Sequence, residues 1–251
     1  MKQVTHASLF SGIGGDDLAA EWAGWRTIFH CELINSKRLW LQHRWPKRTS
    51  YADIKSTNFS VHRHQIDVLT GGDPCQVSSK IGKREGMQGK LYLWPQFFRA
   101  VQESEPIFVV NENVDGTISN GILDQKIDDL ESIGYSCWPP IVIPASFVGA
   151  SHRRDRVWLV ANSTQRRLER RLCCPPKGQR ETQIRPITAL VENKNGNIIP
   201  KPNFLSCDDG IPGRVDEIQG YGNAIVPQVA LLIYKTINNF ADWKQNTHKN
   251  K

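Results

Sequence analysis

The sequence has no uninterrupted apolar run of about 18 residues, the length that a helix needs to cross a bilayer. Mean hydropathy is −0.45, so we expect a globular chain with no membrane span. The first ten residues, MKQVTHASLF, contain no apolar signal core, so we expect a protein that is not secreted. Only six cysteines occur in a chain too long to need disulfide staples. Reduced thiols and a cytoplasmic location are therefore expected.

Acidic residues are fewer than basic ones: 25 Asp and Glu stand against 32 Lys and Arg, and the formal net charge is +7. This excess permits nucleic acid, an anionic membrane or an acidic substrate as partner, and it selects none of them. No group of His and Cys has the spacing of a metal site, so we expect no metal. A length of 251 residues suits one large domain, or one domain with a small appendage.

Short β-rich runs alternate with helix-compatible stretches over the first 160 residues. The expected strands cover residues 4–10, 26–31, 66–70, 107–110, 135–143 and 156–160. The expected helices cover residues 16–23, a stretch from 35 that ends by Pro46, a segment around 97–101, and residues 121–133. This alternation predicts an α/β domain on a mostly parallel sheet.

The composition changes after residue 160. Residues 163–202 are rich in arginine and proline and have no apolar periodicity, so we expect an irregular basic insertion. Order returns with a turn at 220–223 and a helix over 227–240, which has the apolar spacing of an amphipathic helix. The polar tail, 244–251, is expected to be frayed.

A glycine-rich turn, Gly12-Ile13-Gly14-Gly15, joins the first expected strand to the first expected helix. A nicotinamide-binding turn needs a third glycine at position 17, which is Asp here. Asp16 and Asp17 at the helix start also disfavour a pyrophosphate. Glu32, at the end of the second strand, can accept hydrogen bonds from both hydroxyls of a ribose. Two interpretations remain open: a nucleoside-type cofactor without phosphates, or a tight turn that binds nothing.

Polar side chains follow three further strands. Gly72-Asp73-Pro74-Cys75 comes after the third strand, at the sheet edge where the glycine turn lies, and a loop thiol of this kind can act as a nucleophile. Glu112 follows the next strand at the same edge, and Arg154 and Arg156 share one face of the last strand. The ordinary alternatives are an inert thiol, an exposed acid and a solvated basic turn.

Five short motifs in this order resemble those of the cytosine-5 DNA methyltransferases. They are Phe10-x-Gly12-x-Gly14-Gly15, Pro74-Cys75-Gln76, Glu112-Asn113-Val114, His152-x-Arg154-x-Arg156 and Gly222-Asn223-Ala224-x-Val226-Pro227. The resemblance covers residues 4–160 and about 212–240. The compact length and the segment Leu93-Trp94-Pro95-Gln96-Phe97-Phe98-Arg99 are similar to small phage and prophage members of that family.

The resemblance implies a Rossmann-like sheet that binds S-adenosyl-L-methionine and releases S-adenosyl-L-homocysteine, without a metal. Phe10 is implied to pack on the adenine, Glu32 to hold the ribose hydroxyls, and Asp53 to accept a hydrogen bond from the adenine amino group. Asn223 is implied to close the site from the last helix. The other residues implied to contact this cofactor are Gly12, Ile13, Gly14, Gly15, Ile54, Gly72, Pro74, Leu93 and Ala224.

The resemblance also implies methylation at C5 of cytosine. The Cys75 thiolate is implied to attack C6, which makes C5 nucleophilic. Glu112 is implied to bind N3 and the exocyclic amine, Arg154 to hold O2, and Arg156 to support this geometry. A stacked base cannot present C6 to a thiol, so the cytosine is expected to flip out of double-stranded DNA.

DNA contacts are expected from two basic segments. The loop 78–90 is expected to close over DNA. The catalytic domain is expected to comprise residues 1–160 and 212–251, which leaves 161–211 to read the bases. So small a recognition region predicts a short recognition site, and we expect a monomer. The side chains expected to bind DNA are Lys80, Lys83, Arg84, Arg166, Arg167, Arg170 and Arg171.

Asp73 departs from the family pattern, which usually has an apolar residue or proline before Pro-Cys. A carboxylate beside the nucleophile opposes thiolate formation unless it points away or is paired. This departure leaves open a catalytically weakened homologue that binds DNA as a regulator. A cytosine-5 methyltransferase acting on tRNA is a further alternative. A nicotinamide oxidoreductase is opposed by the missing third glycine.

Overall fold

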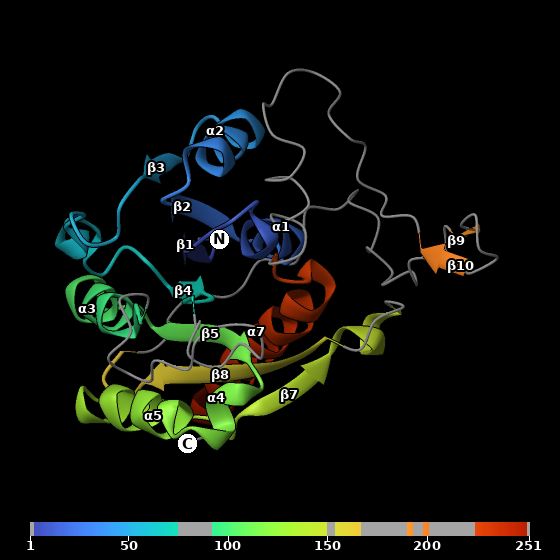
Figure 1. The fold of residues 1–251 in the computed structure, drawn as a ribbon. Coiled ribbons are helices and arrows are strands. Elements are labelled where there is room, and N and C mark those ends of the chain that lie inside the picture. The colour runs from blue at the N-terminus through green and yellow to red at the C-terminus, as the bar shows by residue number, and fades with distance from the viewer. Residues whose placement is uncertain are drawn as a thin grey trace.

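The structure of the chain, a computed structural model, describes residues 3–74, 92–149, 154–166, 190–192, 198–200 and 224–249. Helices lie on both faces of one main sheet (Figure 1). α1 (Gly15–Trp22) and α7 (Pro227–Lys249) cover one face, and α3 (Trp94–Ser104) and α5 (Ile122–Ser132) cover the other. α2 (Asn35–Arg44) follows β2 at the far end of the sheet (Figure 1). The predicted α/β fold is confirmed.

The main sheet has a parallel half and an antiparallel half. The parallel strands, in spatial order, are β3 (Thr49–Tyr51), β2 (Arg26–Cys31), β1 (Thr5–Leu9), β4 (Val68–Gly71) and β5 (Phe108–Val114). The antiparallel strands are β8 (Asp155–Ser163) beside β5, and β6 (Tyr135–Cys137) and β7 (Ile141–Pro144), which both pair with β8. Since β1, β2, β4 and β5 are parallel, their carboxyl ends meet at one edge of the sheet.

β5 shows how the two faces are filled. Phe108 and Val110 point into the core under α1 and α7, whereas Val109 points into the core under α3 and α5. β1 and β4 are likewise buried along their whole length. This burial on both faces explains why their sequences lack the alternation of a strand with one solvated side.

Several strand boundaries differ from the expected ones. β5 runs on to Val114, so Asn111–Asn113 lie within the strand rather than after it, because this stretch pairs with β8 (Glu112 opposite Trp158). The expected strand 135–143 is divided into β6 and β7, since Pro139 and Pro140 have no N–H to donate to a ladder. β8 extends to Ser163.

The structure also contains short elements that the sequence did not predict. They are β3, a 3-10 turn η1 (Phe59–His62), α4 (Gly116–Ser119) and a 3-10 turn η3 (Ala145–Val148). β3 is three residues of Thr, Ser and Tyr that pair with β2, and so short a segment has no strand pattern of its own.

The carboxyl-terminal part is more regular than expected. α7 continues to Lys249, so the expected fraying from 244 is wrong as far as that residue. Of its four predicted apolar positions, Val229, Ile233 and Ile237 are buried, and Leu232 is partly buried against the same core. Within the expected irregular insertion, β9 (Leu190–Glu192) and β10 (Ile198–Pro200) pair antiparallel, and the rest of 167–223 lies outside the described residues. Among the residues that the structure describes, no helix has the length and apolar character to cross a membrane.

Candidate active site

The register of the sheet gathers the predicted site residues at its carboxyl edge. Leu9 at the end of β1 lies between Cys31 of β2 and Gly71 of β4, and Gly71 lies opposite Asn111 of β5. The glycine turn leaves the end of β1, Glu32 follows β2, and the loop Gly72–Pro74 follows β4. Glu112, near the end of β5, lies next to Gly72.

The glycine turn is shaped by close approaches that exclude side chains. Gly14 caps α1 in the left-handed region, and a Cβ there would lie 2.5 Å from the Trp45 ring. A Cβ on Gly15 would lie 2.5 Å from the carbonyl oxygen of Ile225. Gly12 differs: it has φ +56°, yet among the described residues a Cβ would meet only Phe10 O, 4.0 Å away. The backbone at Gly12 is therefore open to the approach of a ligand.

Glu32 is buried, and its carboxylate is fixed against the glycine turn. Oε2 accepts a hydrogen bond from Gly12 N at 2.8 Å, and Oε1 accepts one from Ile34 N at 2.8 Å. Each carboxylate oxygen retains a second lone pair. This arrangement fits a group that offers two neighbouring hydroxyls, as a ribose does, next to the open backbone of Gly12.

The loop that carries Asp53 is anchored from α3. The Arg99 guanidinium donates to Thr57 O at 3.1 Å and also to Ile54 O. Ile54 is buried in the core under α3 and α5, while Asp53 is half-buried and its Oδ1 caps Lys55 N at 2.9 Å. The loop is thus fixed by the domain itself, with Asp53 at its start.

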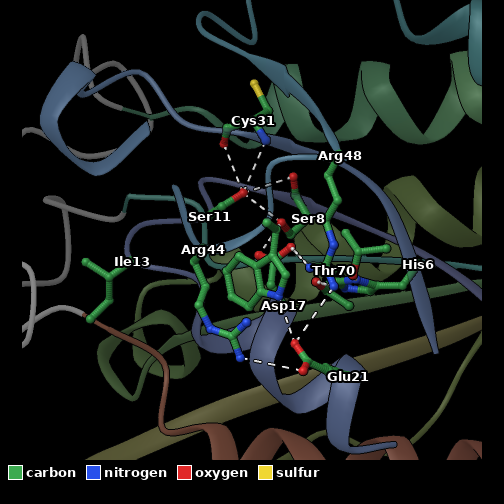
Figure 2. A network of polar contacts seen from close by, with 12 residues as sticks. His6, Ser8, Ser11, Ile13, Asp17, Glu21, Cys31, Arg44, Arg48 and Thr70 are labelled. Carbon is green, nitrogen blue, oxygen red and sulfur yellow. Dashed lines mark hydrogen bonds and ion pairs between the residues drawn. The ribbon is translucent and has the colours of Figure 1, made fainter. Parts of the chain in front are cut away.

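A polar network under the turn accounts for Asp17, the second of the two acidic residues at the start of α1 (Figure 2). Asp17 Oδ2 accepts a hydrogen bond from Ser8 Oγ at 2.8 Å, and Arg48 lies 3.5 Å from its other oxygen. Ser11 Oγ bonds Ser8 Oγ at 2.7 Å, which joins the turn to this network. Burial raises the pKa of Asp17 to about 6. Asp17 therefore supports the turn from inside.

Asp16 is buried on the other side of the turn, where Tyr234 of α7 donates its hydroxyl to Oδ1 at 2.5 Å. Burial raises the pKa of Asp16 to about 7. Asp16 and Asp17 were expected to disfavour a pyrophosphate by presenting acids at the helix start, but both carboxylates are buried and accept hydrogen bonds inside the fold.

Glu112 is buried between two arginines and a glycine. Arg156 Nε lies 2.9 Å from Oε1, and a Cβ on Gly72 would lie 2.8 Å from Oε2. Burial raises the pKa of Glu112, and the charges of Arg156 and Arg154 only partly oppose this rise. Arg154 itself adopts φ +37° just before β8 and donates to Ala224 O at 2.7 Å. A carboxyl of this kind is suited to donate a proton to a ring nitrogen.

Asp73 is paired. Lys126 Nζ lies 2.5 Å from Asp73 Oδ1, which also accepts from Asn111 Nδ2 at 2.8 Å and from Asn113 Nδ2 at 3.2 Å. Both members of the ion pair are buried. A carboxylate before Cys75 was expected to oppose thiolate formation unless it was paired, and Lys126 provides that pairing.

A family model for C-5 cytosine-specific DNA methylases matches residues 4–204. The chain belongs to this family. The predicted resemblance is therefore confirmed. The methylase chain is 29% identical to the type II methyltransferase M.BsuFI of Bacillus subtilis over 223 residues, which cover 85% of the chain and 53% of that protein. It is 30% identical to M.Eco47II of Escherichia coli over 164 residues, or 62% of the chain and 39% of that protein. The chain thus spans about half, or less, of these relatives.

Solved structures of methyltransferases have the same fold. A crystal structure described as a DNA modification methyltransferase encoded within an E. coli prophage has a TM-score of 0.53 and 26% identity, covering 65% of this methylase and 47% of that chain. The crystal structure of the S. pombe Dnmt2 methyltransferase has a TM-score of 0.54 and 17% identity, and the match covers 64% of this chain and 51% of that chain. At this identity the likeness supports the fold alone.

Of the other predicted site residues, some lie at the carboxyl edge of the sheet and others do not. Leu93 caps α3 and is half-buried, and Pro74 is exposed at the carboxyl edge. Arg166 lies at the opposite edge, where its guanidinium donates to Glu105 O, so the structure does not bring it to the site. The predicted residues outside the described ranges are Cys75, Lys80, Lys83, Arg84, Arg167, Arg170, Arg171 and Asn223.

Sequence reasoning missed Lys126, Tyr234 and the two asparagines beside Glu112. Lys126 left a signal: it lies four residues after Ile122 and four before Leu130, within the apolar stripe of α5. A lysine at such a position indicates a buried partner, although the sequence does not name it.

Proposed function

We propose that this methylase transfers a methyl group from S-adenosyl-L-methionine to C5 of cytosine in double-stranded DNA, as a DNA (cytosine-5-)-methyltransferase. The observation that carries the proposal is the buried Glu112, held between Arg156, Arg154 and Gly72 at the sheet edge that also carries Glu32 and the open turn. Family membership supports the reaction class. The names of M.BsuFI and M.Eco47II support a place in type II modification systems.

The residues at the glycine turn fit the cofactor. Glu32 would accept from the ribose hydroxyls, and the Gly12 backbone would lie beside the ligand, since nothing of the described chain fills that space. Phe10, half-buried at the end of β1, and Asp53 would contact the adenine. The proposed cofactor site would also be lined or supported by Ile13, Gly14, Gly15, Ile54, Gly72, Leu93 and Ala224. When bound, S-adenosyl-L-methionine supplies an electrophilic methyl group.

Cys75 would supply the nucleophile, since it follows Pro74 at the carboxyl edge. Its thiolate forms a bond to C6 of cytosine, and the electron pair of the C5–C6 double bond becomes available at C5. C5 takes up the methyl group and then loses its proton to a base. The S–C6 bond breaks, which restores the double bond and the thiolate.

Glu112 would stabilise the charge that develops on the ring. Burial raises the pKa of its carboxyl, which favours the protonated form that would donate to N3 while the other oxygen accepts from the exocyclic amine. Arg154 would bind O2, and Arg156 would hold Glu112 through its contact of 2.9 Å. The cytosine would have to leave the helix stack to reach this buried group, which costs a few kcal/mol of unstacking.

Base recognition would fall to residues 161–211, with the catalytic domain formed by 1–160 and 212–251. The basic side chains of this region and of the loop 78–90 would neutralise phosphates. A short recognition site and a monomeric enzyme remain part of the proposal, because the region left for recognition is small.

The test is methyl transfer with purified protein. Methyl-labelled S-adenosyl-L-methionine and duplex DNA should give labelled 5-methylcytosine, and Cys75→Ser should abolish it, whereas Cys137→Ser is the matched control on a free thiol away from the site. Duplex DNA containing 5-fluorocytosine should trap a covalent complex. Label in adenine, full activity of Cys75→Ser, or preferential methylation of tRNA would contradict the proposal.

A further inference from the structure

A buried cluster of four polar side chains lies under the strand that carries Glu112. Lys126 Nζ donates to Asp73 Oδ1 at 2.5 Å and to Asn111 Oδ1 at 2.8 Å. Asn111 Nδ2 donates to Gly71 O at 3.0 Å, and Asn113 Nδ2 donates to Asp73 O at 3.1 Å. The cluster therefore joins α5, β5 and the loop after β4.

Stability alone does not explain the cluster. Lys126 is 1% exposed and its ammonium lies 4.9 Å from the centre of the Trp94 ring. Removing two charges from water is costly, and an apolar pair of similar volume usually gives equal or greater stability. Asp73 and Lys126 nevertheless keep both charges in a buried position. Their charges thus point to a task at the site.

The cluster holds the backbone on both sides of Glu112. Side chains alternate along a strand, so Asn111 and Asn113 point to the α3 and α5 face while Glu112 points to the other face. Through the two asparagines, the cluster fixes β5 against the loop of Gly71–Asp73. That loop contacts Glu112 at Gly72 and leads directly to Pro74 and Cys75.

We propose that Lys126 is a positioning residue, which locks the Glu112 strand to the loop that precedes Cys75 and cancels the charge of Asp73 at Glu112. This inference rests on the proposed function in one respect: its effect on catalysis assumes that Glu112 acts on cytosine. The placement and the charge balance can be tested without DNA.

The charges that act on Glu112 come from every element around it. Arg156 and Arg154 come from β8 and its approach, Asp73 from the β4 loop, and Lys126 from α5. Glu112 in turn raises the pKa of Asp16 of α1, so these two acids also act on each other. Asp73 raises the pKa of Glu112 and Lys126 lowers it, so the two charges of the pair act on Glu112 in opposite directions.

The test compares Lys126→Met, Asp73→Asn and the double variant. With ¹³C-labelled glutamate, the Glu112 carboxyl is titrated by NMR and assigned with Glu112→Gln. Lys126→Met should move the midpoint upward, Asp73→Asn should move it downward, and the double variant should restore it. A role in folding alone gives no such opposite shifts. Asp67→Asn, a buried acid at the other edge, and Lys235→Met, an exposed lysine, should leave the midpoint unchanged.

Activity supplies the second measurement. Lys126→Met should lower kcat about 10- to 100-fold, with KM for S-adenosyl-L-methionine within about twofold, because a displaced catalytic carboxyl affects the chemical step. The double variant, whose two side chains are neutral and similar in shape, should fold even where a single variant does not. Folded variants with shifts of the same sign, no shifts, or a wild-type kcat would overturn the inference. Opposite shifts in a protein that methylates no DNA would uphold the charge balance and reject the proposed function instead.

Discussion

Gly12 and Gly121 have similar left-handed backbones, so comparing them distinguishes a requirement of folding from a requirement of cofactor binding. Gly12 has φ +56° and Gly121 has φ +74°, and a Cβ would find no close neighbour at either residue. A left-handed backbone costs a non-glycine residue about 1–2 kcal/mol wherever it occurs. Only Gly12 lies beside the Glu32 carboxylate, so only there does the missing side chain leave room for a cofactor.

We therefore predict that Gly12→Ala and Gly121→Ala each lower the free energy of unfolding by about 1–2 kcal/mol. Gly12→Ala should in addition weaken the binding of S-adenosyl-L-homocysteine at least tenfold, because the new methyl group enters the ligand space. Denaturant titration and calorimetry measure the two effects. Equal affinities in the two variants would place the cofactor elsewhere.

Individual residues were predictable from the sequence where a local pattern fixed them. Glu32 directly follows β2 and Glu112 comes after the apolar residues of β5, so their arrival at one edge followed from the parallel order. The Asp73–Lys126 pair was not predictable, because its partners are separated by more than fifty residues and meet only when α5 packs on β5.

At the scale of elements, α3 connects the core to the candidate cofactor loop. Its Arg99 donates to the backbone carbonyls of Ile54 and Thr57, and its Glu103 accepts from Phe59 N at 2.7 Å. Helix and loop are thus joined by a planar guanidinium whose fork a lysine cannot reproduce.

Arg99→Lys should weaken cofactor binding about tenfold and lower Tm by a few degrees, since about 1–1.5 kcal/mol of hydrogen bonding to the loop is lost. Arg63→Lys, in an exposed pair with Glu105, is the control and should change neither quantity. Calorimetry and thermal denaturation provide the measurements. Unchanged affinity in a destabilised Arg99→Lys protein would separate this loop from the cofactor.

Elements with a strong pattern of their own were predicted well: β2, α2 and α5 lie within a residue or two of their expected positions. β3 and the division between β6 and β7 depend on tertiary pairing and on two prolines. The antiparallel direction of β8 also had no local signal, because a strand pattern is the same in either direction.

At the scale of the whole molecule, buried aspartates and buried histidines change the free energy of unfolding with pH in opposite directions. Burial raises the pKa of Asp16 to about 7 and that of Asp17 to about 6, so the folded state binds protons that the unfolded state releases above pH 4. Burial lowers the pKa of His6 to about 3 and that of His30 to about 4, which has the opposite effect. The contribution of these histidines levels off only above about pH 7, where the unfolded imidazoles are also neutral.

The stabilisation that Asp16 contributes should fall by about 1–2 kcal/mol between pH 6 and pH 8, since it disappears as pH rises through the raised pKa of about 7. The buried histidines add stability over part of the same interval, so the quantity to compare is the difference in unfolding free energy between the wild-type protein and Asp16→Asn. Urea titrations of both proteins at half-unit pH intervals measure it. A difference that stays constant from pH 6 to pH 8 would show that the Asp16 carboxyl is ionised in the fold.

The position of α7 in the chain has a consequence for synthesis. Trp25 stacks on Tyr234 at 4.5 Å, and α7 covers the sheet face that contains Val68 and Phe108. Trp25 is synthesised more than two hundred residues before Tyr234, and Val68 and Phe108 are synthesised more than one hundred residues before α7 begins. The part of this face that α7 covers must therefore wait on the ribosome until residues 227–240 emerge, a period in which chaperones, or a second nascent chain, can reach it.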